Sequence, residues 1–192
     1  MAARLDRPVV AFASQRAWEA WLKRHHTTSP GVWLKIAKQA SGHASVTYDQ
    51  AVEGALCYGW IDGQKRPHDA AWWLQKFTPR RAKSIWSKIN RGKALRLIKA
   101  GRMTPAGLRE VHGAKRDGRW VAAYDSARTM RVPPDLQAAL NKNVKAKAFF
   151  KEISAGYRYA ILWRIHDAKR PETRAKRIAD FVRRLQRHET LH

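Results

Sequence analysis

The first third of the chain alternates between helical and strand-like hydrophobic periods. Val9–Phe12 is a short apolar run that can form a strand. From Gln15 to His25 large side chains recur every three or four residues, which predicts a helix that Ser14 caps. From Val32 to Ile36 successive side chains alternate between two faces, which is the period of a half-buried strand.

The next segment predicts a second helix followed by a hairpin. Thr47 begins a capping box, and the apolar stripe after it predicts a helix that ends at Gly59. Two β-like runs, Trp60–Arg66 and Trp72–Phe77, are joined by the short polar connection at residues 67–70. The predicted order is β-α-β-α-β-β, which is a small α+β unit.

The remainder of the chain is predicted to be mainly helical. One helix is expected near Ser84, and Thr104 starts another that reaches about Arg116. The core face expected for the first is Trp86, Ile89, Ala94, Leu97 and Ile98. Further helices are predicted at Pro134–Asn141, Val144–Ile153, Gly156–Ala168 and Glu172–Arg187. We therefore expect an α+β domain at residues 1–117, a connector at 118–133 and a helical module at 134–192.

Composition indicates a folded protein. The chain has 192 residues, of which 44% are hydrophobic and nine are tryptophan, too much apolar area for a disordered segment. Cys57 is the single cysteine, so an intrachain disulfide and a cysteine-rich metal site are excluded. The apolar run at Val9–Ala13 is too short for a signal peptide, and no segment has the apolar length of a transmembrane helix. We expect a soluble protein in the cytoplasm.

The net charge of +24 changes this picture because it favours anionic partners. Residues 1–80 contain 11 Lys+Arg and 6 Asp+Glu, whereas residues 81–192 contain 28 and 9. The excess therefore lies mostly in the second part of the chain. Nucleic acid or another polyanion is the expected partner, and an acidic protein is a further candidate. The alternative is that the charge serves solubility or reflects biased composition.

The hairpin and the segment after it gather residue types that bind planar or anionic groups. The candidate pocket residues are Trp60, Asp62, Lys65, Trp72, Arg80, Arg81, Ser84, Trp86 and Asn90. Tryptophan faces beside arginines can stack a planar group, and arginines before a helix suit a phosphate or carboxylate. The alternative is that the tryptophans fill the core while Asp62 pairs with a lysine or arginine.

The last predicted helix is basic around most of its surface. Its candidate polyanion-binding residues, with the one just before it, are Arg170, Arg174, Arg177, Arg183, Arg184 and Arg187. Such a helix can contact nucleic-acid phosphates or an acidic membrane. It can also be solvated while it packs on Tyr159, Leu162 and Trp163. Phe181 is the only aromatic wedge on its apolar side, so membrane insertion is the least favoured of these.

The sequence contains none of the common catalytic or nucleotide-binding motifs, such as GxGxxG, Walker A, HExxH or GxSxG. Its eight histidines form no metal-binding pattern. Cys57 stands at the helix end that disfavours a thiolate, so we interpret it as a buried apolar residue. We expect no cofactor and no metal, and we favour a protein that is not an enzyme.

Several ordered motifs carry a family resemblance. They are ALCYGWIDGQ at residues 55–64, FTPRR at 77–81, SIWSKIN at 84–90, GRMTPAG at 101–107 and AKRPETR at 168–174. With these motifs the chain resembles the YdeI/OmpD-associated family of bacteriocin-protection proteins from about Trp18 to Leu185. The resemblance implies a role in stress or bacteriocin tolerance. It implies no particular reaction, cofactor or catalytic residue.

Two functions from different classes follow. The first is a non-enzymatic protein of bacteriocin tolerance that binds nucleic acid or another polyanion through its basic C-terminal helices. The second is a small-molecule-binding protein or enzyme that acts on an anionic or aromatic metabolite at Trp60, Asp62, Arg80 and Arg81. The second requires these side chains to line one cavity.

Overall fold

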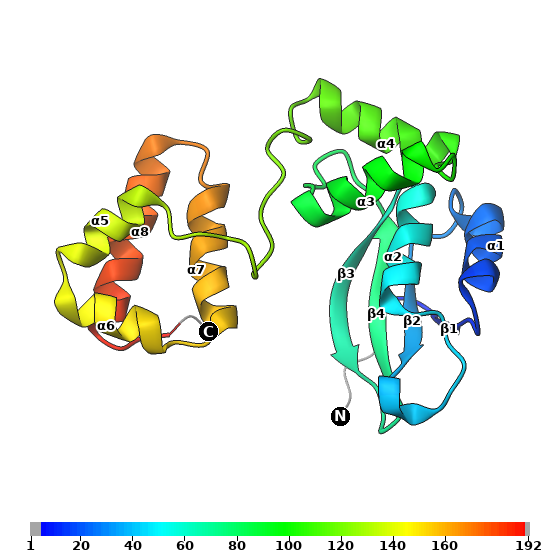
Figure 1. Cartoon of the computed structure of the whole chain (residues 1–192), viewed down its shortest axis with the longest axis horizontal. Helices are drawn as coiled ribbons and strands as arrows, with labels where there is room; N and C mark the ends of the chain where they lie inside the picture. The colour runs from blue at the N-terminus through cyan, green and yellow to red at the C-terminus, as the bar shows by residue number, and fades with distance from the viewer. Residues whose placement is uncertain (1–4, 191–192) are drawn as a thin grey trace. The chain divides into compact units, whose positions relative to one another are not determined.

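The computed structural model of the chain describes residues 5–190 (Figure 1). It divides into two compact units, with the boundary between Ala123 and Tyr124. The first unit combines a four-stranded sheet with helices, and the described part of the second is built from helices. The predicted fold class, an α+β unit followed by a mainly helical part, is confirmed.

The elements follow the predicted order. The strands are β1 (Val9–Ala11), β2 (Val32–Ala37), β3 (Trp60–Pro67) and β4 (Trp72–Pro79). The first-unit helices are α1 (Gln15–His25), the 3-10 helix η1 (Gln39–Ser41), α2 (Tyr48–Cys57), α3 (Lys88–Lys99) and α4 (Pro105–Arg116). The second-unit helices are α5 (Pro134–Asn141), α6 (Val144–Glu152), α7 (Ala155–Asp167) and α8 (Pro171–Gln186).

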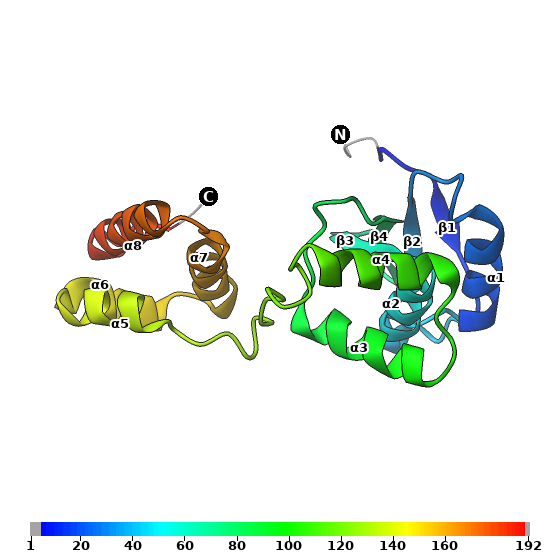
Figure 2. The ribbon, with the colours of Figure 1, turned by 90° about the horizontal axis from the view of Figure 1, so that it is seen from above.

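The sheet has the strand order β1-β2-β4-β3. β1 and β2 are parallel because α1 connects them, whereas β2–β4 and β3–β4 are antiparallel. Alternate residues of β2, namely Val32, Leu34 and Ile36, join the core that α1 and α2 also line. Figure 2 shows α2 alongside one side of the sheet. The predicted hairpin is present, with an irregularity between Asp62 and Lys65.

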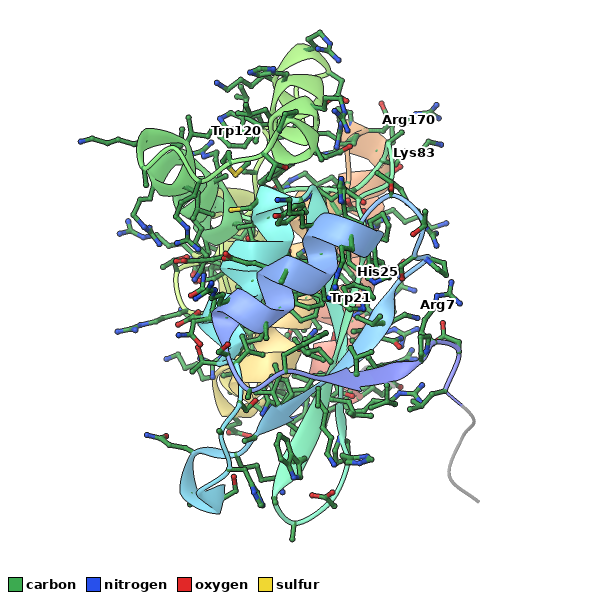
Figure 3. The ribbon with its side chains drawn as sticks, turned by 90° about the vertical axis from the view of Figure 1, so that its right-hand side faces the viewer. Arg7, Trp21, His25, Lys83, Trp120 and Arg170 are labelled. Atoms are coloured by element: carbon green, nitrogen blue, oxygen red, sulfur yellow. The ribbon has the colours of Figure 1, made fainter. Side chains whose placement is uncertain are left out.

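Aromatic packing joins α1 to α2. Trp18 is fully buried, and its indole N–H donates to the carbonyl of Ala51 over 3.0 Å. Trp21 stacks on Trp18 with ring centroids 5.4 Å apart, and Trp21 and His25 lie one turn apart on α1 (Figure 3). A Cβ on Gly54 of α2 would lie 2.9 Å from the Trp18 ring. The close approach of the two helices therefore requires glycine there.

The start of α4 packs equally closely on the end of α2. The Thr104 hydroxyl donates to the carbonyl of Cys57 over 2.6 Å. A Cβ on Gly107 would lie 2.5 Å from the same carbonyl oxygen. Gly59 ends α2 with a φ of +76°, a left-handed conformation that favours glycine. α4 is thereby fixed on the first-unit core.

α3 starts later than the sequence indicates. Ser87 is its N-cap and accepts a hydrogen bond from the Asn90 backbone N–H at 3.1 Å, so the expected start near Ser84 is wrong. Ala94 and Leu97 face the core, but Ile89 is 52% exposed. Five residues separate Ile89 from Ala94, which places the two about 140° apart around a helix. The expected core position of Ile89 is therefore wrong as well.

The segment after α4 belongs to the first unit up to Ala123. Trp120 and Ala123 are buried in the first-unit core, and Trp120 packs edge-on against Trp86 with centroids 4.9 Å apart. We therefore propose residues 124–133 as the connector between the domains. This connector is shorter than the one that the hydrophobic pattern predicts.

The second unit has a core of its own. α8 contributes Ile178, Phe181 and Leu185, which cluster with Leu162 of α7. The remaining buried members include Leu136, Leu140, Ala146, Phe150, Ile153, Ile161 and Ile165. Of the residues expected beneath α8, Leu162 joins this core, whereas the Tyr159 hydroxyl bonds to the carbonyl of Asp125. Between residues 5 and 190, no helix combines the length and apolar character needed to cross a bilayer.

Candidate functional site

Two of the three tryptophans predicted to line the pocket, Trp60 and Trp86, are core residues. Trp60 is 1% exposed, and its indole N–H donates to the carbonyl of His26 over 3.1 Å. Its ring meets Trp21 edge-on with centroids 5.9 Å apart. Trp86 is equally buried against Trp120. Neither ring face is available to a ligand, so the core interpretation holds for both.

Asp62 connects three elements of the first unit. Its carboxylate accepts a 2.7 Å hydrogen bond from the Tyr48 hydroxyl at the start of α2 and a 3.4 Å bond from the Asn90 amide of α3. Within residues 5–190 it forms no salt bridge with a lysine or arginine. The expected ion pair of Asp62 is therefore replaced by neutral donors.

The adjacent arginines have different environments. Arg80 is only 7% exposed, and its guanidinium carbon lies 3.7 Å from the centroid of the Trp86 ring. Its Nη1 donates to the carbonyl of Ile85. Arg81 is exposed, while its backbone N–H donates to the Ser84 hydroxyl over 2.9 Å. Arg80 thus holds the segment before α3, and Arg81 faces solvent.

Trp72 lies at the opposite end of the hairpin from Arg80. In the β2–β4 pairing Trp72 faces Ala37, whereas Arg80 follows the last residue of β4. Eight residues of strand correspond to about 26 Å at about 3.3 Å per residue. The nine predicted residues therefore do not line one cavity.

A groove does exist at the Trp72 end. It has a volume of about 560 Å³ and is lined by Ile36, Ala37, Lys38, Gln39, His43, Ser45, Val46, Thr47, Tyr48, Asp49 and Trp73. Lys65, one of the predicted residues, lies beside it with Nζ 4.3 Å from the centroid of the Trp73 ring. No local sequence signal indicated that residues 38–49 line a groove with Trp73.

Two of the candidate arginines of the last helix hold the second unit together. Arg174 binds Asp135 with Nε–Oδ2 and Nη2–Oδ1 distances of 2.6 and 2.9 Å, and its Nη1 donates to the carbonyl of Ile165 over 2.9 Å. Arg177 donates to the carbonyl of Arg164. Both side chains tie α8 to its neighbours. Arg174 therefore has a structural role in the second unit, and its contact with a polyanion stays a prediction.

The other arginines near this helix are exposed. Arg183 pairs with Asp180 over 3.1 Å, and Arg187 reaches Glu189 at 4.0 Å. Together with Arg184 these side chains surround an open hollow of about 330 Å³. Two carboxylates already occupy its rim, so its local charge is only weakly positive.

Within the first unit, residues 81–123 carry a more concentrated excess of positive charge than the second unit does. Residues 81–123 contain 12 Lys+Arg and only 2 Asp+Glu, whereas residues 124–192 contain 16 and 7. The unit boundary at Ala123 therefore divides the basic half of the sequence. About half of the net positive charge of residues 81–192 therefore lies in residues 81–123, which include α3 and α4, and not in the C-terminal helices.

Some of these cations hold the first unit together. Arg102 binds Glu19 and Glu53 over 2.8 and 3.1 Å, and these hydrogen bonds raise the pKa of Arg102 against the opposing effect of its partial burial. Lys93 binds Asp49 over 3.1 Å. Five others, Arg96, Lys99, Arg109, Lys115 and Arg116, are exposed and have no salt bridge to a carboxylate among residues 5–190. These five form the accessible basic surface of α3 and α4.

Cys57 lacks the environment of a nucleophile. It is buried, and this burial raises the pKa of its thiol to about 11. A nucleophilic cysteine has a lowered pKa instead. In the described part of the chain, no three side chains of the histidine, cysteine, aspartate or glutamate type converge as metal ligands would.

The two regions of the chain match two family models. Residues 10–110 match a family described as "Domain of unknown function (DUF8412)", and residues 129–188 match "Bacteriocin-protection, YdeI or OmpD-Associated". No curated protein and no solved structure matches the chain. Of the motifs that carry the resemblance, only AKRPETR lies in the second range, so the YdeI/OmpD-associated match is shorter than expected. The chain therefore belongs to the DUF8412 family, whose model covers just over half of it, and residues 129–188 are similar to the YdeI/OmpD-associated bacteriocin-protection family.

Proposed function

We propose that this protein of the bacteriocin-protection type is a non-enzymatic binder of nucleic acid, which it contacts through the phosphate backbone. The second-unit family match supports the coarser role in bacteriocin protection. The charge distribution supports the nucleic-acid partner and points to the basic surface of α3 and α4 as the principal contact. Such a partner implies a cytoplasmic location, as the sequence predicts.

The observation that carries this proposal is the ratio of 12 basic to 2 acidic residues at positions 81–123. One of the two acids, Asp117, is bound by Arg119 over 2.7 Å, and that hydrogen bond lowers the pKa of Asp117. Arg109 and Arg116 lie seven residues apart on α4 and therefore share one face. Phosphate neutralisation by such cations supplies sequence-independent affinity.

The test measures binding of a fluorescein-labelled 20-base-pair DNA duplex by anisotropy between 50 and 200 mM salt. The variant Arg96→Glu plus Lys99→Glu reverses two exposed charges one turn apart on α3. The matched control, Lys23→Glu plus Arg24→Glu, makes the same change on the exposed side of α1.

We expect the α3 variant to bind at least about tenfold more weakly, whatever the duplex sequence. Its salt slope should become shallower by about 0.9 for each phosphate contact that is lost. The α1 control should retain most of the affinity. Equal losses in both variants would show that net charge alone governs binding. Weak, salt-insensitive binding by the unmodified protein would refute the nucleic-acid proposal.

A further inference from the structure

We propose that the groove at the Trp72 end of the sheet binds a nucleobase together with its attached phosphate. Its walls are the end of β2, the loop at residues 38–47, the first turn of α2 and Trp73 of β4. This inference extends the proposed function, because it assigns base stacking to a region separate from the basic surface of α3 and α4. The same chemistry is offered by a free nucleotide and by an unpaired base of a single strand.

The size and lining of the groove suit a small planar group. Its volume of about 560 Å³ lies within the range of about 300–1,000 Å³ that ligand sites occupy. Ile36 and Val46 give its lining an apolar part, while Ser45 and Thr47 add hydroxyl groups. An aromatic ring can thus be desolvated there and still find hydrogen-bonding partners.

The aromatic side chains of the groove provide stacking faces. Tyr48 is 39% exposed, and its ring centroid lies 5.9 Å from that of the half-buried Trp73. The hydrogen bond from the Tyr48 hydroxyl to Asp62 holds the ring in place before any ligand arrives. His43, which also lines the groove, stacks on Trp72 at 5.1 Å with an interplanar angle of 21°. Preorganised rings of this kind bind bases of any sequence.

Cations lie where the phosphate of a stacked base would lie. Lys65 rests over the Trp73 ring, and Lys38 donates to the backbone carbonyl of Asp69 over 2.8 Å. Both lysines are exposed, so either ammonium group can turn toward a phosphate at little cost. The lining carboxylate, Asp49, is bound by Lys93 over 3.1 Å. The groove therefore offers aromatic faces in a locally positive setting, which is the combination that single-strand binding sites use.

A base inside a duplex is already stacked and paired, so it cannot enter this groove without being extruded. Single-stranded DNA should consequently depend on the groove, and duplex DNA should not. This difference separates the groove from the α3–α4 surface, which contacts the phosphates of both forms. It also separates a binding role of Tyr48 from a purely structural one.

The experiment compares Tyr48→Ala, Tyr48→Phe and Lys38→Gln plus Lys65→Gln with the unmodified full-length protein. A labelled ten-nucleotide oligothymidylate and a 20-base-pair duplex are titrated by anisotropy at 50 mM salt, and AMP and UMP are titrated by calorimetry. Lys23→Gln plus Arg24→Gln on the exposed side of α1 is the charge-matched control for the double lysine variant. Thermal unfolding of each variant shows whether it remains folded, and Lys38→Gln plus Lys65→Gln, which changes exposed side chains, tests the groove if Tyr48→Ala is unfolded.

We expect Tyr48→Ala to weaken oligothymidylate binding about 5-fold to 100-fold, as removal of a stacking side chain does. Duplex binding should change less than about twofold, and Tyr48→Phe should keep most of the single-strand affinity. Nucleotide binding that depends on Tyr48, without single-strand binding, would assign the groove to free nucleotides. Unchanged oligothymidylate and nucleotide binding in all groove variants overturns the inference but leaves the α3–α4 proposal intact. Loss of duplex binding in Arg96→Glu plus Lys99→Glu alone bears on that proposal and not on the groove.

Discussion

Replacement of Arg174 by alanine should destabilise the second unit, because this arginine joins three helices. Its guanidinium binds Asp135 of α5 through two nitrogens and donates to the Ile165 carbonyl of α7 through the third. The hydrogen bonds to Asp135 raise the pKa of Arg174. Truncation would leave the Asp135 carboxylate without its cation and the end of α7 without one of its donors.

The expected loss of unfolding free energy in Arg174→Ala depends on how exposed Arg174 and Asp135 are. The ion pair is partly exposed, so its contribution is limited to about 1 kcal/mol even with bidentate geometry. The bond from a charged donor to the Ile165 carbonyl contributes about 1 kcal/mol more. A loss of about 2 kcal/mol corresponds to a fall in Tm of roughly 10 °C for a domain of this size.

Hydrogen exchange on the full-length protein measures this effect. Peptides from residues 134–186 report on the second unit, and peptides from residues 60–79 report on the first. We expect faster exchange in the former only. The control is Arg170→Ala, one turn earlier on the chain, where an exposed arginine forms no ion pair among residues 5–190. Its effect should stay within about 0.5 kcal/mol.

Two results would refute this reasoning. If Arg170→Ala and Arg174→Ala had equal effects on exchange, the geometry of the Arg174 contacts would not matter. If Arg174→Ala kept full stability and lost nucleic-acid affinity, the residue would act as the polyanion-binding side chain that the sequence predicts. Arg174→Lys, which keeps the charge but loses the bidentate geometry, should fall between the unmodified protein and Arg174→Ala.

Three further outcomes follow from the structure. The hydrogen bond from Arg174 lowers the pKa of Asp135. The ionised Asp135 therefore stabilises the fold above its unfolded pKa of about 3.9, and this stabilisation is lost as the pH falls through the lower folded pKa. In urea unfolding, the stability difference between the unmodified protein and Asp135→Asn should shrink below about pH 4. Gly107→Ala should cost about 2 kcal/mol or more, because its Cβ would lie 2.5 Å from a backbone oxygen, whereas Gly92→Ala, with no atom within 4 Å, should be neutral or stabilising by thermal unfolding. The Cys57 thiol, with its pKa raised to about 11 by burial, should react with a thiol reagent at pH 8 about two orders of magnitude more slowly in the native than in the unfolded protein; equal rates would contradict the buried position.

The charge pattern shows where a sequence argument needs a structure. The sequence locates the positive excess correctly in residues 81–192, but it does not show which positions belong to the same unit. The burial of Trp120 and Ala123 assigns residues up to 123 to the first unit. A basic region that seemed to be a C-terminal property is therefore shared between two units. The strongest ratio of basic to acidic residues lies on the α3–α4 side of the division.

The sequence by itself determined the order and most limits of the secondary structure. Periodicity and capping residues are local, so the capping box at Thr47, the turn at Gly59 and the start of α4 at Pro105 could be identified from neighbouring positions. α3 shows the limit of this approach. Trp86 is buried from outside the helix by Trp120, a contact over 34 residues that no periodicity contains.

Only the tertiary structure decided which side chains meet. The length of β4 separates Trp72 from Arg80, which the sequence placed in one pocket. The packing of α2 brings Tyr48 to Trp73, a contact that the sequence did not indicate. Two arginines of the same predicted basic set likewise differ, because Arg174 binds Asp135 of another helix and Arg170 is exposed to solvent. Burial and ion pairing depend on contacts between distant segments, so they are properties of the packed fold and not of the local pattern.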